Sequence, residues 1–229
     1  MILPEGRKLL PVRWVGRRPA GWSGSIEGMN ADQVAALRAL LAPTGWLDRT
    51  QAFAQALRRS ARTPNGLLIV GTADDEPWHM TAHLADESRY AGLPELAPTL
   101  VRWAPEPRAP GHLAVGLDRL RAATRAETLL VVSQQAASPE LLERVHDVRR
   151  AGATVFALDQ DDPELDQLAH ESLRVSPVTA PVSFDGAQHL VTSSVGAAPS
   201  QPGTLANPDR RLRSRLARLL DAVSGTPAD

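Results

Sequence analysis

Three side chains that could bind a metal ion or move a proton recur at helical spacing in the first half of the chain. His79 and His83 are four residues apart, and Asp86 follows three residues later, which places all three on one face of a helix. Imidazole nitrogens and carboxylate oxygens are common zinc ligands. The spacing predicts a zinc site with His79 and His83 as ligands. Half-exposed helices also carry such histidine pairs by chance, and no H-E-x-x-H pattern is present.

A second polar group lies in the loop at 133–138, Ser-Gln-Gln-Ala-Ala-Ser. Hydroxyls, amides and backbone N–H groups gather there just before a predicted helix, and helix N-termini attract anions. The loop predicts a site for a phosphate or for sugar hydroxyls, with contacts from Ser133, Gln134, Gln135 and Ser138. In the alternative interpretation, Ser138 only caps its helix and the glutamines are solvated.

The elements around that loop predict a complete parallel βαβ unit. Residues 127–133 contain the continuous apolar run of a strand buried on both faces, and helical periodicity follows from Pro139 to Val148. Gly152 is typical of a helix end, and 154–158 is a second apolar run. Two buried strands joined by a helix indicate a parallel sheet, in which ligands bind beyond the carboxyl ends of the strands.

The rest of the chain extends this unit into an α/β three-layer sandwich with a parallel sheet. Further strands are predicted at 67–71, 99–103 and 173–175, and Thr72 follows the first of them. Helices are predicted at 30–41, 47–61, 77–90, 117–123, 163–170 and 184–195, the last leaving the sheet. We therefore predict an N-terminal arm at 1–29, one α/β domain at 30–195, and a linker with a C-terminal amphipathic helix at 196–229.

The composition limits the chemistry and the binding partners that the protein can have. The 229 residues contain no cysteine and carry a formal net charge of -1, which excludes thiolate chemistry and gives no overall attraction to nucleic acid or anionic membranes. No apolar run approaches the roughly 20 residues of a membrane span, and the first residues lack a signal-peptide pattern. We expect a cytoplasmic protein without a membrane or nucleic-acid partner. The arginine-rich helix at 209–223 leaves such a role open as the least favoured alternative.

Taken together, these residues resemble the sugar isomerase (SIS) domain, a phosphosugar-binding α/β family. Gly71-Thr72-Ala73 resembles the family's first turn, residues 133–139 resemble its phosphate loop, and residues 168–172 resemble its short L-A-x-x-A segment. The resemblance covers residues 45–195. Among single-domain members, phosphoheptose isomerase looks most similar, because Q-H-F-A-A-E-L on its helix after the first turn is similar to residues 78–84 here.

The resemblance implies site residues and a function, with departures from the family pattern. His79 matches the family's metal-ligand histidine, His83 stands where the family has a catalytic glutamate, and residues 185–189 match the late I-Q-E-x-H segment loosely. The serine of the first turn falls on Asp75. The resemblance implies a sugar-phosphate isomerase or related aldose–ketose enzyme, with phosphate bound by Thr72, Ser133, Gln134, Gln135 and Ser138, and protons moved by His83 and His189.

Two further expectations follow from the resemblance. Sites of this family are usually completed by a neighbouring subunit, which implies a homodimer. The missing glutamate and the reduced set of hydroxyls also fit a protein that does not catalyse a reaction, either a sugar-phosphate sensor or a degenerate subunit that acts through a protein partner. No cofactor other than zinc is expected.

Overall fold

Five short apolar runs form one sheet in which all neighbouring strands are parallel. The computed structural model describes residues 41–106 and 108–196. Across the sheet the strands follow the order β2-β1-β3-β4-β5. Their bounds are β1 (Leu67–Val70), β2 (Pro98–Val101), β3 (Thr128–Ser133), β4 (Thr154–Asp159) and β5 (Glu171–Arg174).

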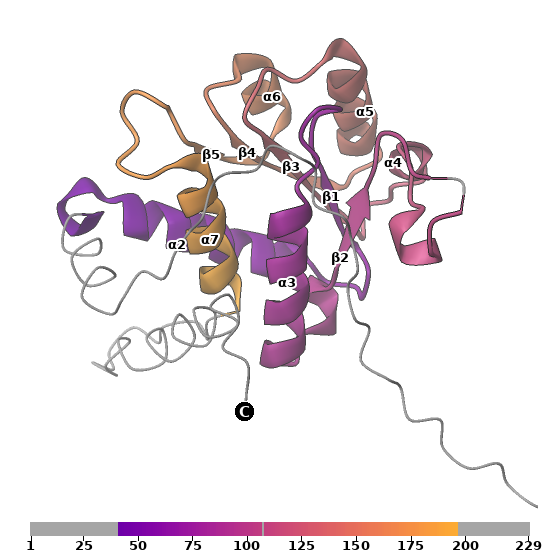
Figure 1. Ribbon diagram of the computed structural model, residues 1–229, viewed down its shortest axis with the longest axis horizontal. Helices are drawn as coiled ribbons and strands as arrows, with labels where there is room; N and C mark the ends of the chain where they lie inside the picture. Colours follow the sequence, from indigo (N-terminus) through magenta and orange to yellow (C-terminus); the bar gives the residue numbers. More distant parts are fainter. Residues whose placement is uncertain (1–40, 107, 197–229) are drawn as a thin grey trace, which may run out of the picture.

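Helices cover both faces of this sheet and complete a three-layer α/β sandwich (Figure 1). On one face lie α2 (Trp46–Ser60), α3 (Trp78–Ala91) and α7 (Phe184–Val195). On the other lie α4 (Asp118–Arg121), α5 (Pro139–Arg150) and α6 (Pro163–Leu168). Single 3-10 turns at Ala42–Thr44, Pro94–Leu96 and Gly111–Leu113 complete the connections. The predicted fold class is confirmed.

Each strand contributes to two separate cores because successive side chains point to opposite faces. In β3, Leu130 and Val132 pack with α2, α3 and α7, whereas Leu129 and Val131 pack with the helices of the opposite face. Every residue of β3 is buried. This explains why the strand is an unbroken apolar run in the sequence and confirms its predicted place inside the sheet.

The strand order fixes where a ligand can approach. The chain leaves β1 through α3 toward the β2 edge, and it leaves β3 through α5 toward the opposite edge. In such doubly wound sheets, a crevice opens beyond the carboxyl ends of the two strands where the direction reverses, here β1 and β3. The loops at 71–77 and 134–138 follow these two strands, so the fold places Thr72 and the predicted phosphate loop at the same edge of the sheet.

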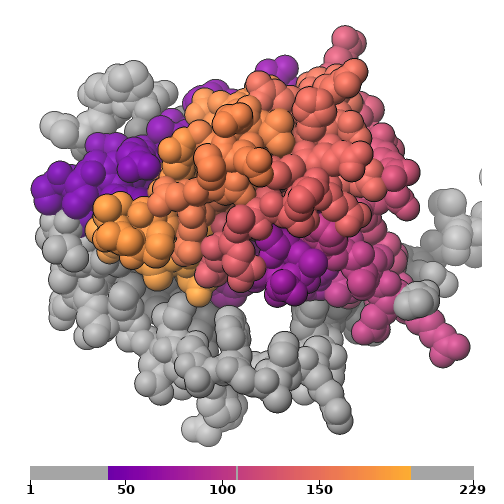
Figure 2. All heavy atoms as spheres, turned by 90° about the horizontal axis from the view of Figure 1, so that it is seen from above, coloured from indigo at the N-terminus to yellow at the C-terminus, as the bar shows by residue number. Residues whose placement is uncertain are grey.

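The helix at 184–195 was predicted with the right bounds but the wrong course. Rather than leaving the sheet, α7 packs beside α2 and α3, and Ala187, Val191 and Val195 are fully buried there. In the space-filling view, the last described segment (orange) lies against the first (indigo) (Figure 2). The periodicity predicted the helix, but it could not identify the helices that α7 contacts.

Several predicted segments lie outside the described residues, namely the arm at 1–29, nearly all of the helix at 30–41, and the linker and amphipathic helix at 196–229 except Gly196. Within the described ranges, none of the helices is both long and apolar enough to cross a membrane.

Candidate functional site

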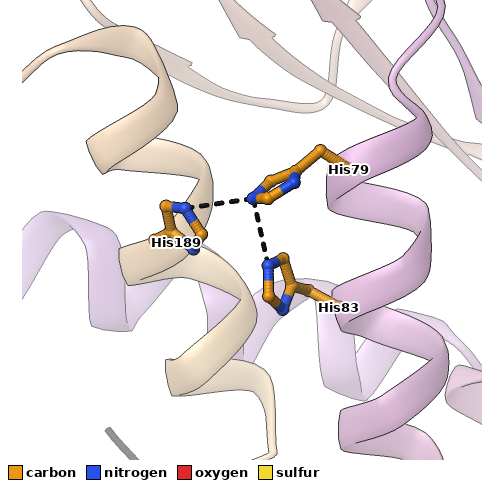
Figure 3. A group of neighbouring side chains, drawn as sticks. All are labelled: His79, His83 and His189. Atoms are coloured by element: carbon orange, nitrogen blue, oxygen red, sulfur yellow. Dashed lines mark hydrogen bonds between the residues drawn. The ribbon is translucent and has the colours of Figure 1, made fainter. Parts of the chain in front are cut away.

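Two helices from distant parts of the chain carry the candidate site. α3 buries Met80 and Leu84 against the sheet, so His79 and His83 lie on its flank toward α7. Ser183 is the N-cap of α7, and its Oγ accepts the N–H of Gly186 at 3.1 Å. Ala187 and Val191 of α7 point into the core, and His189 lies on another side of the helix, where it faces His79 of α3 (Figure 3).

The three imidazole rings converge on one point between α3 and α7 (Figure 3). The Nε2 atom of His79 is 3.0 Å from that of His83 and 3.1 Å from that of His189. Three imidazole nitrogens bound tetrahedrally to zinc at roughly 2.0–2.1 Å would be about 3.3 Å apart. The observed spacing is close to this value, and the three residues can offer ligand atoms that all lie within 4.8 Å of one another.

The electrostatics of the cluster favour neutral rings, the form that binds metal. Partial burial lowers the pKa of His79 and of His189. Burial, together with repulsion from His79 and His189, lowers the pKa of His83 to about 4. A neutral ring nitrogen carries either a proton or a lone pair, so three converging Nε2 atoms cannot all be satisfied by one another. A bound cation would satisfy them, and the residues therefore fit zinc.

A carboxylate on α7, Asp185, acts on two of the histidines and on a second carboxylate, Asp75. Asp185 stands one helical turn before His189 on α7 and acts electrostatically on both His79 and His189, raising the pKa of each against the effect of burial. Burial raises the pKa of Asp75, and the negative charge of Asp185 adds to this rise. Asp86, predicted to share the histidine face, raises the pKa of His83 against the larger effects of burial and of the neighbouring histidines, and it also forms an exposed ion pair with Arg89 at 2.7 Å.

The loop between β1 and α3 is held in one conformation by Glu76. Its carboxylate accepts hydrogen bonds from Arg102 Nε at 2.9 Å, Trp78 Nε1 at 3.0 Å and the Trp103 N–H at 3.0 Å. At Gly71, a Cβ would lie 2.2 Å from the carbonyl oxygen of Asp75, so only glycine lets the loop fold back this tightly. These contacts fix the start of α3 and thereby the position of His79.

A pocket of about 330 Å³ opens beside the cluster, beyond the carboxyl ends of β3, β4 and β5. Its size falls at the small end of the range for small-molecule sites. Asp185, which acts electrostatically on His79 and His189, belongs to its lining. The lining combines amide, hydroxyl and carboxylate groups with apolar walls and consists of Gln134, Gln160, Ser183, Asp185, Val175, Pro177, Val182 and Phe184.

The predicted phosphate loop is largely occupied by contacts within the protein. The hydroxyl of Ser133 is buried and donates to the carbonyl of Gln135. Ser138 caps α5, accepting the N–H of Leu141 at 3.3 Å, as the alternative interpretation predicted. The N–H of Ala137 donates to the carboxylate of Asp162 at 2.7 Å.

Of the remaining predicted contacts, Gln134 lines the pocket and Gln135 is exposed. Thr72 lies beyond β1, next to the end of β3. Its hydroxyl is buried and has no hydrogen-bond partner among the described residues. Buried hydroxyls usually have a partner, so the Thr72 hydroxyl has an unmet hydrogen bond, but Thr72 is not among the residues that line the pocket.

Three residues of this region were missed as site residues in the sequence. Asp75 was noted only as a departure from a serine, and Asp185 only as part of a loosely matched segment. Asp162 stands directly before Pro163. An Asp at the N-cap followed by proline predicts a helix start, which Asp162 does provide for α6. Its second contact, with an amide 25 residues away, leaves no pattern in the sequence.

The fold and site define a parallel α/β sandwich with a three-imidazole cluster beside its ligand edge. No protein-family model and no curated protein matches the chain. Among solved structures, it is similar to the sugar isomerase domain of the RpiR transcription factor from Sphaerobacter thermophilus, at 13% identity and a TM-score of 0.45, over 83% of this chain and 98% of that one.

Two further structures are similar. One is a protein of Silicibacter pomeroyi provisionally named a phosphosugar isomerase, with 17% identity and a TM-score of 0.46. The match covers 84% of this chain and 54% of that one. The other is Vibrio vulnificus NanR in complex with ManNAc-6P, with 13% identity and a TM-score of 0.40, over 87% of this chain and 72% of that one. At such identities, function has to be inferred from the side chains of this chain.

Proposed function

We propose that the protein binds a sugar at the carboxyl edge of its sheet and interconverts its aldose and ketose forms, with zinc held by His79, His83 and His189. The observation that carries the proposal is the convergence of three Nε2 atoms at 3.0 and 3.1 Å near a pocket whose lining includes Asp185, a carboxylate that acts electrostatically on His79 and His189. The isomerase chemistry comes from the resemblance of residues 45–195 to the sugar isomerase domain.

Within this proposal, each residue of the site has a separate role. Zinc bound to the three imidazoles would polarise a carbonyl or hydroxyl oxygen of the sugar. Asp185, in the lining of the pocket, would take a proton from one carbon and return it to the next. His83 and His189, predicted as proton carriers, act here as ligands. Gln134 and Ser183 would hold sugar hydroxyls, and Phe184 would contact the apolar face of the sugar ring.

The test follows proton transfer directly. Zinc-loaded protein is incubated in D2O with a panel of aldoses and ketoses, free and phosphorylated, and deuterium at the carbon next to the carbonyl is measured by NMR. Asp185→Asn should lower the turnover rate by roughly 10²–10⁴-fold, the usual contribution of a positioned acid or base. His146→Ala, an exposed histidine on α5, is the matched control and should leave turnover unchanged. Full activity of Asp185→Asn would refute the assigned role.

A second candidate is a sensor that binds the sugar without converting it. One observation favours it. Asp185 is the only acidic or basic side chain among the described residues that line the pocket, and the three nearby imidazoles would be occupied as zinc ligands. Tight binding with no deuterium incorporation in any sugar would decide for the sensor. Light scattering of the purified protein would test the predicted homodimer, on which a sensor or degenerate subunit would also depend.

A further inference from the structure

We infer that the pocket selects an uncharged sugar over its phosphate ester, because the carboxylate of Asp162 occupies the loop amide that a phosphate would need. This inference rests on the proposed function, since it specifies the sugar that binds at the same site. It also departs from the phosphorylated ligand that the sequence resemblance implies.

The first observation is the filled loop. Asp162 is 7% exposed and divides its two oxygens between two helices. Oδ2 accepts the N–H of Ala137 at 2.7 Å, just before α5. Oδ1 accepts the N–H groups of Glu164 and Leu165, both at 3.0 Å, at the start of α6. An anionic oxygen of the protein thus already takes the place where helix-terminal amides would receive a phosphate oxygen.

A second buried carboxylate stands directly behind the first. Asp159, at the end of β4, is fully buried, and its Oδ1 accepts the N–H of Asp162 at 2.9 Å. Its Oδ2 has no hydrogen-bond partner in the part of the chain that the structure describes. Burial raises the pKa of Asp159, and the negative charge of Asp162 contributes to this rise. A phosphate placed at this loop would meet carboxylates where it needs donors.

The third observation is the absence of positively charged side chains from the pocket lining. The zinc proposed at the histidines would add positive charge beside the pocket, and Asp185, which acts electrostatically on His79 and His189, would offset part of it. None of the eight described residues that line it is lysine, arginine or histidine, and Asp185 contributes a carboxylate. The arginines at the neighbouring strand ends are already paired, Arg102 with Glu76 at 2.9 Å and Arg174 with Asp166. Arg108 is exposed on the loop after β2, outside the lining. Phosphate sites normally pair the anion with such groups.

The groups that remain suit a neutral polyol. Gln134 and Gln160 offer amide donors and acceptors, Ser183 offers a hydroxyl, and Asp185 is an acceptor for sugar hydroxyls. Val175 and Phe184 provide apolar walls for the C–H faces of a sugar ring. Hydroxyl groups can use all of these contacts without requiring a cation.

The experiment compares matched pairs on the full-length, zinc-loaded protein: fructose with fructose 6-phosphate, glucose with glucose 6-phosphate, and ribose with ribose 5-phosphate. Calorimetric titration should show that one free sugar binds at least about tenfold more tightly than its phosphate, which corresponds to about 1.4 kcal/mol. Inorganic phosphate should not shift the melting temperature. Asp162→Ser keeps a capping oxygen for α6 and frees the amide of Ala137. This variant should shift the ratio of the two dissociation constants by at least about tenfold in favour of the phosphate.

Asp161→Asn is the control, because it removes one charge from the same loop and asparagine tolerates the left-handed φ of 65° at this position. It should change the preference less than threefold. If the wild-type protein binds the phosphorylated member tenfold more tightly, the inference is wrong while the proposed function stands. If no member of any pair binds, the proposed function fails and the inference with it. The wild-type comparison decides even if Asp162→Ser does not fold.

Discussion

Replacing one histidine of the cluster should abolish most of the stabilisation that zinc gives. Zinc at 100 times its dissociation constant would stabilise the folded protein by about 2.7 kcal/mol. For a chain of this size, that corresponds to a rise in melting temperature of about 5–11 °C. Because the Nε2 atoms of His83 and His189 both meet that of His79, removing any one leaves two ligands.

The size of the loss can be worked out for His189→Ala. Changes in groups that only orient metal ligands weaken metal binding about 10–100-fold, so loss of a direct ligand should reach at least the upper end of that range. A hundredfold weaker site at the same zinc concentration retains about 0.4 kcal/mol of stabilisation, or about 1–2 °C. Without zinc, the variant should melt close to the wild type, because His189 is only partly buried.

The assay is differential scanning fluorimetry with and without zinc, combined with metal analysis of dialysed protein. His79→Ala and His83→Ala should behave like His189→Ala, whereas His146→Ala should keep the full zinc shift and bind one zinc per chain. If all three cluster variants kept the wild-type shift, the zinc site would lie elsewhere. If none of the proteins, wild type included, responded to zinc or to another divalent metal, the convergence of the rings would have no role in metal binding.

Three predictions concern the architecture around the site. Glu76→Ala leaves three donors without their acceptor and should lower the unfolding free energy by about 2 kcal/mol in a urea titration, and a loss below about 0.5 kcal/mol would contradict this. Gly71→Ala forces a Cβ to within 2.2 Å of the Asp75 carbonyl, so it should destabilise by about 2 kcal/mol or more in the same titration. Because the folded-state pKa of Asp159 is raised, ionising this carboxyl group lowers the stability of the folded protein. The stability therefore falls as the pH rises from the unfolded-state pKa of about 3.9 through the folded-state pKa. Asp159→Asn should therefore unfold at a higher urea concentration than the wild type at pH 7 and lose this advantage near pH 3. A constant difference across this range would show that ionisation is not the cause.

The elements of the fold were predictable because burial determines the sequence pattern locally. β3 is buried on both faces and is therefore an unbroken apolar run. Ser138 and Gly152 mark the ends of α5 by capping and by a left-handed φ of 89°. Such rules act within a few residues, so they also gave the bounds of α7, but not the helices that it packs against.

The site was predictable only in part, for the same reason. His79 and His83 share one helix, and their spacing alone brought them together. His189 joins them from 110 residues away, and only the resemblance to a family suggested that it belonged there. The contact between Asp162 and the Ala137 amide joins residues 25 apart in the chain, which is beyond the reach of local rules. The family resemblance did not suggest this contact either, because it implied a phosphate at this loop.

The distance between α3 and α7 along the chain also sets the order of events during synthesis. The two proposed ligands on α3 are made early, and the third lies on the last described helix. Closing a chain segment of 110 residues costs about 4 kcal/mol in length-dependent entropy, which packing of α7 against α2 and α3 has to offset. A nascent chain would therefore hold zinc weakly through two histidines until α7 has left the ribosome. Metal loading would then report that the sandwich is complete.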